Sequence, residues 1–564
     1  MSSQTVAMPT AVRRAGDWLS RGHAYVATIR PLYALSTLVA VQWAAVAALA
    51  VTVRHNGWVY YMGGDQLWHY TSAYLLAHRE IAPTLVGYGW STLLVPIARF
   101  AGFDLVSALP AIVILSAGVL LPIALVAIYG IASRIGGRVF GYWVAVLWVA
   151  LPFAGIPYAV ERYHQKYTEL TLPQILGLGA MSDLPSVVAL LVGAYLCLRA
   201  LDERDWRWGA AAGFAVGYSL SIKPSNAVFL FAPAIVFLIY RWRTALTFAA
   251  GLVPPLALLA FWKFRGYGTL PAFAHAQASD RRIALGILTP IHKYTHDNSW
   301  TQLHNNLLQL REFFWSDRLL EFAVIAGVLA LLLRSRRAGL FVGVWFFAFL
   351  LLKGTYFNSR IEDATFWRLM LPAFPAFILL VASVPLLFPG VRLRPPAART
   401  APIPRRIAIS VAVAVGLVLF AFPLAVIAAA KPVREPNLSA IQFNATLVPI
   451  VKQLQTTATL EPNGVLLQWP ASKPTPGNVF YRVLRTGPDA TDEECRKVSR
   501  APDSCIDAVT SELGTTRAGA WLDRPPPGRW TYRVGLSANW LNDPSQGDVY
   551  AFGPHVVIDV PAKR

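Results

Sequence analysis

Charged residues are scarce in this chain. Only 14% of its 564 residues are Asp, Glu, Lys or Arg, whereas 55% are hydrophobic. Soluble domains carry roughly a quarter of their residues as charged side chains. Apolar runs of about eighteen residues or more recur along the sequence, and such runs are typical of transmembrane helices. The shortage of charge excludes an ordinary soluble protein and predicts a polytopic α-helical membrane protein.

Cysteine is also scarce, with three in the chain. Cys197 lies in an apolar run, where it is expected to be a small core residue. Cys495 and Cys505 lie close together in a polar tail and are expected to form a disulfide if that tail is extracytoplasmic. The sequence lacks a Walker A loop, a dinucleotide-binding fingerprint, a His-Glu-x-x-His motif and a Gly-x-Ser-x-Gly context, which argues against an ATP-driven pump.

The formal net charge of +20 comes from basic residues in short loops between apolar runs. That placement follows the positive-inside rule, so we interpret it as membrane orientation and expect no nucleic-acid partner. Arginines in the N-terminal segment 1–31 place it in the cytoplasm. The later basic clusters fall on the same side if the number of spans is odd, which puts the C-terminus outside. Composition suggests the inner (plasma) membrane of a bacterium.

The hydropathy pattern predicts about eleven spans. The first run is too long for the apolar region of a signal peptide and is interpreted as a signal anchor. The segment 85–100 has a marginal length and is expected to lie at the outer interface as a helix. The expected spans are 32–53, 107–130, 138–157, 184–201, 208–222, 225–240, 245–262, 319–334, 338–356, 368–388 and 407–430.

The chain therefore divides into the N-terminal segment, a transmembrane domain over residues 32–431 and an outer domain over 441–564. The loops 54–106, 158–183 and 263–318 are expected to face outward. Strand-like runs at 464–469, 479–484, 530–534 and 555–560 are separated by Pro, Gly and Asp turns, which predicts a small β-sandwich. Its Trp and Tyr positions resemble the fibronectin type III pattern, which implies a binding or spacing role.

The first outer loop contains Gly64-Asp65-Gln66 and, shortly after, His69. A carboxylate at the membrane surface could act as a general base or bind a cation. It could equally cap a helix that starts at Gln66. The two roles are compatible.

The second outer loop gathers Glu161, Arg162, His164 and Lys166. Basic side chains at the membrane surface could hold a phosphate, and guanidinium suits a phosphate especially well. They could also anchor the loop beside lipid headgroups.

Three further charged residues stand at the edges of apolar runs: Asp183, Lys223 and Arg368. Charge at such a position is costly unless it is paired or faces a polar cavity. Capping is the simpler explanation for Asp183, snorkelling for Lys223 and interfacial anchoring for Arg368. Farther along, His292 and His296 have the i, i+4 spacing of metal ligands, but nearby Pro and Asn residues disfavour a helix there.

The order of these motifs resembles the GT-C glycosyltransferases, especially the protein O-mannosyltransferase and lipid A aminoarabinose transferase branch. The resemblance runs through about residues 33–388. It rests on Gly64-Asp65, Ser133-Arg-Ile-Gly-Gly-Arg138, Asp183-Leu-Pro185, Ile222-Lys-Pro224 and Arg368-Leu-Met-Leu-Pro-Ala-Phe-Pro375. The protein mannosyltransferases carry Asp-Glu in the first loop, where this chain has Asp65-Gln66.

The resemblance implies a polyprenyl-phosphate-linked sugar as donor, and a glycan, lipid or protein as acceptor outside the cytoplasm. It implies that Asp65 acts as base, that Asp183 forms part of the same cavity, and that the anomeric carbon is inverted. It assigns donor phosphate binding to Lys223, Arg162 and Lys166, and Arg368 is added to them as a phosphate contact. The residues expected to line the acceptor cavity are His69, Glu161 and His164. No cofactor is certain, and a divalent metal ion stays open.

Two other functions compete with the glycosyltransferase. A transporter or flippase of lipid-linked saccharides would show broken helices and internal repeats, and no convincing repeat is present. An assembly protein would place its function in the outer β domain and make Asp65 dispensable.

Overall fold

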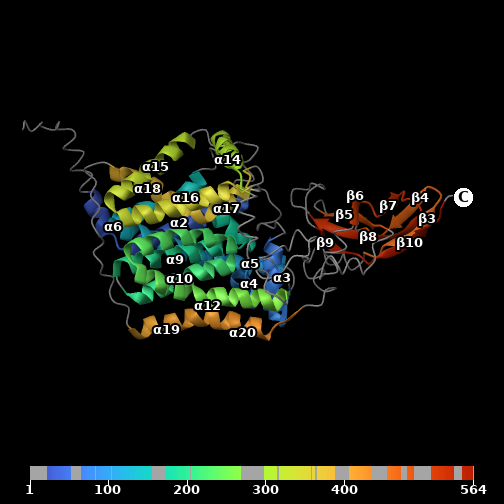
Figure 1. The fold of residues 1–564 in the computed structure, drawn as a ribbon, viewed down its shortest axis with the longest axis horizontal. Coiled ribbons are helices and arrows are strands. Elements are labelled where there is room, and N and C mark those ends of the chain that lie inside the picture. The colour runs from blue at the N-terminus through green and yellow to red at the C-terminus, as the bar shows by residue number, and fades with distance from the viewer. Residues whose placement is uncertain are drawn as a thin grey trace, which may run out of the picture.

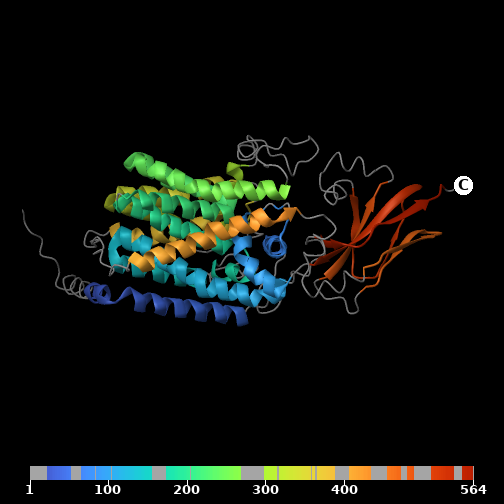
Figure 2. The ribbon, with the colours of Figure 1, turned by 90° about the horizontal axis from the view of Figure 1, so that it is seen from below.

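The computed structural model describes residues 22–52, 65–82, 84, 86–102, 105–154, 173–203, 205–267, 298–313, 317–356, 359–361, 365–387, 405–432, 454–471, 479–487, 510–538 and 549–562. Up to residue 429, most of these residues form a bundle of roughly parallel helices, and from residue 457 onward they form β-sheets (Figure 1). The sheets lie beyond the end of the bundle where α3 and α17 are found (Figures 1 and 2).

The helices of the bundle follow the apolar runs of the sequence. They are α2 (Pro31–Thr52), α3 (Asp65–Ala77), α4 (Tyr88–Ala101), α5 (Leu105–Leu115), α6 (Leu121–Ala154), α8 (Pro173–Leu176), α9 (Asp183–Glu203), α10 (Trp206–Ile222), α11 (Phe231–Tyr240), α12 (Trp242–Tyr267), α14 (Trp300–Phe313), α15 (Asp317–Arg334), α16 (Arg336–Gly354), α17 (Thr365–Met370), α18 (Phe374–Ser383), α19 (Arg405–Gly416) and α20 (Phe422–Ala429). Short 3-10 or π turns join several of them, including η4 (Pro224–Leu230) before α11.

Within the described residues, seven helical segments are long and apolar enough to cross a membrane. The central segment Asp183–Glu203 is 72% buried inside the protein, whereas only 17% of Pro31–Ala48 and 11% of Ile409–Ala429 are buried. The two outer segments therefore present their apolar side chains to the surroundings, as expected for helices in lipid. Each expected span coincides with a helix, and the total of eleven spans stays a prediction.

Two expected breaks between spans are present. α6 is interrupted at Gly137, whose φ of 84° and ψ of 177° are non-helical, because glycine tolerates positive φ without steric cost. This break separates the two runs expected at 107–130 and 138–157. A second break lies at Lys223, which caps α10 in an extended conformation before Pro224 opens η4.

The segment expected as an interfacial helix at 85–100 is α4, and most of its residues pack into the bundle. Beside it, residues Glu80–Ile81 form β1, which pairs in parallel with β2 (Lys431–Pro432). The chain leaving the last span is thus attached to the loop between α3 and α4. Since α3 and the end of α20 lie together, both belong to the same end of the bundle.

The C-terminal region forms two antiparallel sheets. One contains β3 (Thr457–Glu461), β4 (Gly464–Gln468) and β7 (Ala520–Asp523), in that order. The other has the order β10-β8-β5-β6, with β9 also paired to β8. Its strands are β5 (Val479–Thr486), β6 (Thr510–Thr516), β8 (Gly528–Ala538), β9 (Val549–Phe552) and β10 (Val556–Val560). The four predicted strands correspond to β4, β5, β8 and β10, whereas β3, β6, β7 and β9 were not predicted.

A polar contact links the two sheets. Asp523 on β7 accepts hydrogen bonds from Arg485 Nη1 on β5 at 2.8 Å and from the Tyr532 hydroxyl on β8 at 2.6 Å. Burial and the Asp523 carboxylate raise the pKa of Tyr532, so this hydroxyl remains a donor.

Candidate active site

Four elements bring charged side chains together at one end of the bundle. Asp65 lies in the first turn of α3 and Asp183 in the first turn of α9, where carboxylates interact favourably with the helix dipole. Lys223 is at the turn after α10, and Arg368 is on α17. Each residue lies where an apolar run begins or ends. The four side chains therefore lie at the same height along the axis of the bundle.

These four residues form a continuous chain of ion pairs. Lys223 Nζ lies 2.5 Å from Asp183 Oδ1, and Arg368 Nη2 lies 3.3 Å from Asp183 Oδ2. The same Arg368 nitrogen lies 2.6 Å from Asp65 Oδ2. Two carboxylates and two cations therefore alternate in the order Lys223, Asp183, Arg368, Asp65, and their formal charges cancel.

The four side chains differ in exposure, which is lowest at Asp183 and highest at Asp65. The side chain of Asp183 is fully buried, those of Lys223 and Arg368 are 18% and 22% exposed, and that of Asp65 is 52% exposed. Asp183 uses both oxygens on the two cations, which suits it to hold them in place. Asp65 is the carboxylate that a substrate can reach.

A hydrogen-bond network behind Asp183 fixes it relative to Lys223. Ser186 Oγ donates to the Asp183 carbonyl at 2.8 Å, and Ser219 Oγ donates to the Ser186 carbonyl at 2.8 Å. Asn226 Nδ2 then donates to Ser219 Oγ at 2.9 Å. Because Ser219 and Asn226 flank Lys223 in sequence, these bonds join the start of α9 to the turn that carries the lysine.

α4 packs against the segments that carry the site. A Cβ at Gly87 would lie 2.0 Å from the Ser221 carbonyl oxygen, so only glycine lets α4 approach the end of α10 this closely. Trp90 Nε1 donates to the Ala180 carbonyl at 2.8 Å, just before Asp183. The segments on both sides of the Asp183–Lys223 pair are therefore held by α4.

Two more titratable residues lie near the four charges. His69 is buried on α3, with Nδ1 3.3 Å from Ser91 Oγ on α4. Lys263 on α12 donates from Nζ to the carbonyls of Thr84 at 2.5 Å and Val86 at 2.9 Å, which ties α12 to the segment between α3 and α4. Burial lowers the pKa of His69 from 6.5 to about 4, although the carboxylates of Asp65 and Asp183 oppose this shift.

The lowered pKa of His69 predicts a loss of stability in mild acid. In the unfolded chain this imidazole binds a proton as the pH falls through 6.5, whereas in the folded protein it stays neutral until about 4. The unfolding midpoint in detergent should therefore fall as the pH drops from 6.5 towards 4, and His69→Gln should reduce that fall. His78→Gln, at an exposed position just after the same helix, is the control. Equal pH dependence in wild type and His69→Gln would contradict the assignment.

The described residues contain no group of three or more His, Cys, Asp and Glu side chains that could hold a metal ion. Arg368 lies between Asp65 and Asp183, where a metal bridging the two carboxylates would have to be. Among the described residues, this donor set therefore does not fit a metal ion.

The five predicted catalytic, phosphate-binding and cavity residues within the described part of the chain are brought together. Asp65, Asp183, Lys223 and Arg368 form the ion-pair chain, and His69 lies beside them. The predicted residues Glu161, Arg162, His164 and Lys166, and also Cys495 and Cys505, lie outside the described residues. The buried, free Cys197 matches its expected place in the core.

Lys263 was missed by the sequence analysis. The span expected at 245–262 stops one residue before it, and α12 continues to Tyr267. Its signal was a lysine within the apolar run Ala-Phe-Trp-Lys-Phe, since a charge inside such a run needs a polar partner.

Comparison with known sequences finds a family match over part of the chain. Residues 170–264 match the sequence model of the family described as dolichyl-phosphate-mannose-protein mannosyltransferase. The matched segment contains Asp183, Lys223 and Lys263. No curated protein matches the chain.

Comparison with solved structures finds distant similarities. An oligosaccharyltransferase from Archaeoglobus fulgidus, tethered to an acceptor peptide, is 13% identical with a TM-score of 0.39, covering 75% of this chain and 59% of its own. The same organism's AglB with an inhibitory peptide and a dolichol-phosphate is 13% identical with a TM-score of 0.36, at coverages of 72% and 57%. ArnT from Cupriavidus metallidurans is 12% identical with a TM-score of 0.36, at coverages of 62% and 59%. The present chain thus spans less than two thirds of these proteins.

Proposed function

We propose that this protein transfers a sugar from a polyprenyl-phosphate-linked donor to an extracytoplasmic acceptor, with Asp65 as the general base. The observation that carries the proposal is the ion-pair chain, in which a half-exposed carboxylate stands beside two partly buried cations. Base and cations are the two kinds of group that displacement of a phosphate by a hydroxyl requires.

In the proposed reaction, the hydroxyl oxygen of the acceptor attacks the anomeric carbon of the donor. Asp65 accepts the proton of that hydroxyl. The bond from that carbon to the phosphate oxygen breaks, and its electron pair leaves with the lipid phosphate. Lys223 and Arg368 stabilise the charge that develops on this leaving group. Attack opposite to the leaving group inverts the anomeric carbon.

Arg368 keeps donors for such a phosphate. A guanidinium has five N–H donors, and the ion pairs with Asp65 and Asp183 use Nη2. Arg368 Nε is buried and has no hydrogen-bond partner among the described residues. An unsatisfied buried donor is costly, so an acceptor oxygen arriving with the substrate would be favoured there.

The remaining assignments complete the proposal. Arg162 and Lys166 join the donor phosphate site from the second outer loop, and His69, Glu161 and His164 line the acceptor side. The site end of the bundle faces outward in a bacterial inner membrane, with the N-terminus in the cytoplasm. The two C-terminal sheets form a fibronectin type III-like sandwich above the site, where it controls acceptor access.

A transfer assay tests the function itself. Purified protein is incubated in detergent with a panel of radiolabelled polyprenyl-phosphate sugars and a cell-envelope extract as acceptor. We expect label from at least one donor to appear in the acceptor fraction. If none is transferred, while vesicles containing the protein move a lipid-linked sugar across the bilayer, the protein is a flippase and the proposal is wrong.

A further inference from the structure

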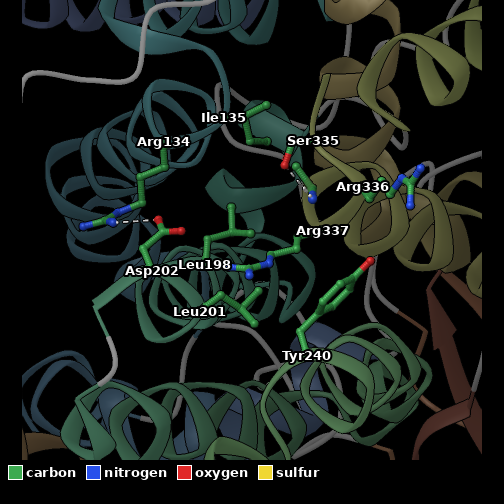
Figure 3. A pocket seen from close by; sticks show the side chains of 10 residues that line it. Arg134, Ile135, Leu198, Leu201, Asp202, Tyr240, Ser335, Arg336 and Arg337 are labelled. Atoms are coloured by element: carbon green, nitrogen blue, oxygen red, sulfur yellow. Dashed lines mark hydrogen bonds and ion pairs between the residues drawn. The ribbon is translucent and has the colours of Figure 1, made fainter. Parts of the chain in front are cut away.

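A second polar site lies at the other end of the bundle. There, a cavity of about 450 Å³ opens between the end of α9, the end of α11 and the start of α16. Its lining includes Arg134, Asp202, Tyr240, Arg336 and Arg337 (Figure 3). This volume is within the roughly 300–1,000 Å³ of small-ligand sites.

The helix geometry separates this cavity from the candidate active site. Asp183 begins α9 and Asp202 is near its end, so they are about 28 Å apart at a rise of roughly 1.5 Å per residue. That distance is about the thickness of a bilayer's hydrocarbon core. The cavity therefore opens at the opposite membrane surface, where the arginines concentrate and which the positive-inside rule assigns to the cytoplasm.

The cavity carries an excess of positive charge. Three arginines and one aspartate line it, which gives a formal charge of +2. Arg134 is neutralised by Asp202 at 3.1 Å and Glu203 at 2.8 Å, and yet its Nε is buried with no hydrogen-bond partner among the described residues.

The other two arginines differ from Arg134 in their partners. Within the described part of the chain, Arg336 and Arg337 form no ion pair, and Arg337 lies 5.4 Å from the ring centre of Tyr240. In Figure 3 the Arg337 side chain lies between Leu198 and Tyr240, whereas the guanidinium of Arg336 points away from Arg337. A guanidinium without a carboxylate partner is well suited to bind a phosphate.

The rest of the lining is apolar. Ile135, Leu198 and Leu201 form the wall beside the arginines. A soluble anion would gain nothing from this wall, whereas a phospholipid would place its phosphate among the guanidiniums and its glycerol and upper acyl carbons along the leucines.

We propose that this cavity binds the headgroup of an anionic phospholipid from the cytoplasmic leaflet, with Arg337 holding the phosphate in the cavity and Arg336 adding positive charge at its edge. The bound lipid would contact α9, α11 and α16 together. Among the described residues, no ion pair of Arg336 or Arg337 links these helices. The inference is independent of sugar transfer and requires only the proposed orientation.

Native mass spectrometry of the purified protein in a neutral detergent tests the proposal. Phosphatidylglycerol is titrated against the wild type and against Arg336→Gln/Arg337→Gln, with phosphatidylcholine as the neutral lipid. We expect the double variant to bind phosphatidylglycerol roughly thirtyfold more weakly, because each basic residue near the membrane surface contributes about 1 kcal/mol of electrostatic attraction. The unfolding midpoint without lipid shows that the variant is folded, and each single variant should lose part of the affinity.

A matched control removes the same charge from the same end of the bundle. Arg207 and Arg243 are exposed and lie over Trp206 and Trp242, outside the cavity. Arg207→Gln/Arg243→Gln should retain wild-type affinity. Equal loss in this control would show a general basic surface and overturn the site. Equal binding of phosphatidylcholine, or displacement of the lipid by millimolar inorganic phosphate, would also overturn it.

Discussion

Asp65→Asn is expected to lower the rate of sugar transfer about a hundredfold to ten-thousandfold, the range over which a positioned general base contributes. The amide keeps the shape of the side chain and its place in the first turn of α3, but it cannot accept the proton of the acceptor hydroxyl. Rates are compared with the donor that labels most strongly in the wild-type assay. The unfolding midpoint should change little, because Asp65 is half exposed and exposed ion pairs contribute little stability.

Asp202→Asn is the matched control for this variant. Asp202 is 53% exposed and pairs with Arg134, much as Asp65 is 52% exposed and pairs with Arg368, but it lies at the opposite end of the bundle. It should retain full activity. If Asp65→Asn transfers sugar at the wild-type rate, Asp65 is not the general base and only stabilises the start of α3. The assay itself would still establish the enzyme.

Asp183→Asn is expected to destabilise the protein by about 3–5 kcal/mol, the cost of leaving a buried charge without its partner. Asp183 is fully buried and joins Lys223 to Arg368, so its loss leaves Lys223 uncompensated and Arg368 held by Asp65 alone. The unfolding midpoint in detergent measures the effect. Activity should fall as well, because the two cations are no longer held at the leaving group.

Two comparisons separate burial from charge. Glu203 also lies between two arginines, Arg134 and Arg199, but its side chain is 37% exposed. Glu203→Gln should therefore lower the free energy of unfolding by about 1 kcal/mol or less. Adding Lys223→Met to Asp183→Asn removes the unpaired cation and should restore part of the stability without restoring activity. If Asp183→Asn unfolds at the wild-type midpoint, the ion-pair chain does not hold the site together.

The membrane class and the positions of the helices followed from the sequence alone. Lipid offers no hydrogen-bond partners, so a spanning segment must be a long apolar helix, and that requirement is visible in any window of about eighteen residues. The breaks at Gly137 and at Lys223-Pro224 were readable for the same reason, because Gly and Pro act locally on the backbone. In the tail, strands with strong β-branched and aromatic runs were found.

Elements and residues with weaker sequence patterns were not predicted. β6 contains Ser, Glu and Gly and shows little hydrophobic alternation, so only its pairing with β5 makes it a strand. Lys263 was missed because hydropathy marks where a charge ends a span and does not show a helix continuing beyond it.

The sequence by itself determined which charges stand at the edges of apolar runs: Asp65, Asp183, Lys223 and Arg368. It did not determine that they touch. Arg368 and Asp65 are separated by 303 residues in the sequence. An arginine at a membrane edge can equally interact with lipid headgroups. Only the packing of α3, α9, α10 and α17 decided that Arg368 lies between two carboxylates and Lys223 on the buried one. The physical reason is that the cost of a charge in an apolar run is a local property, whereas the partner that offsets it is supplied by the tertiary structure.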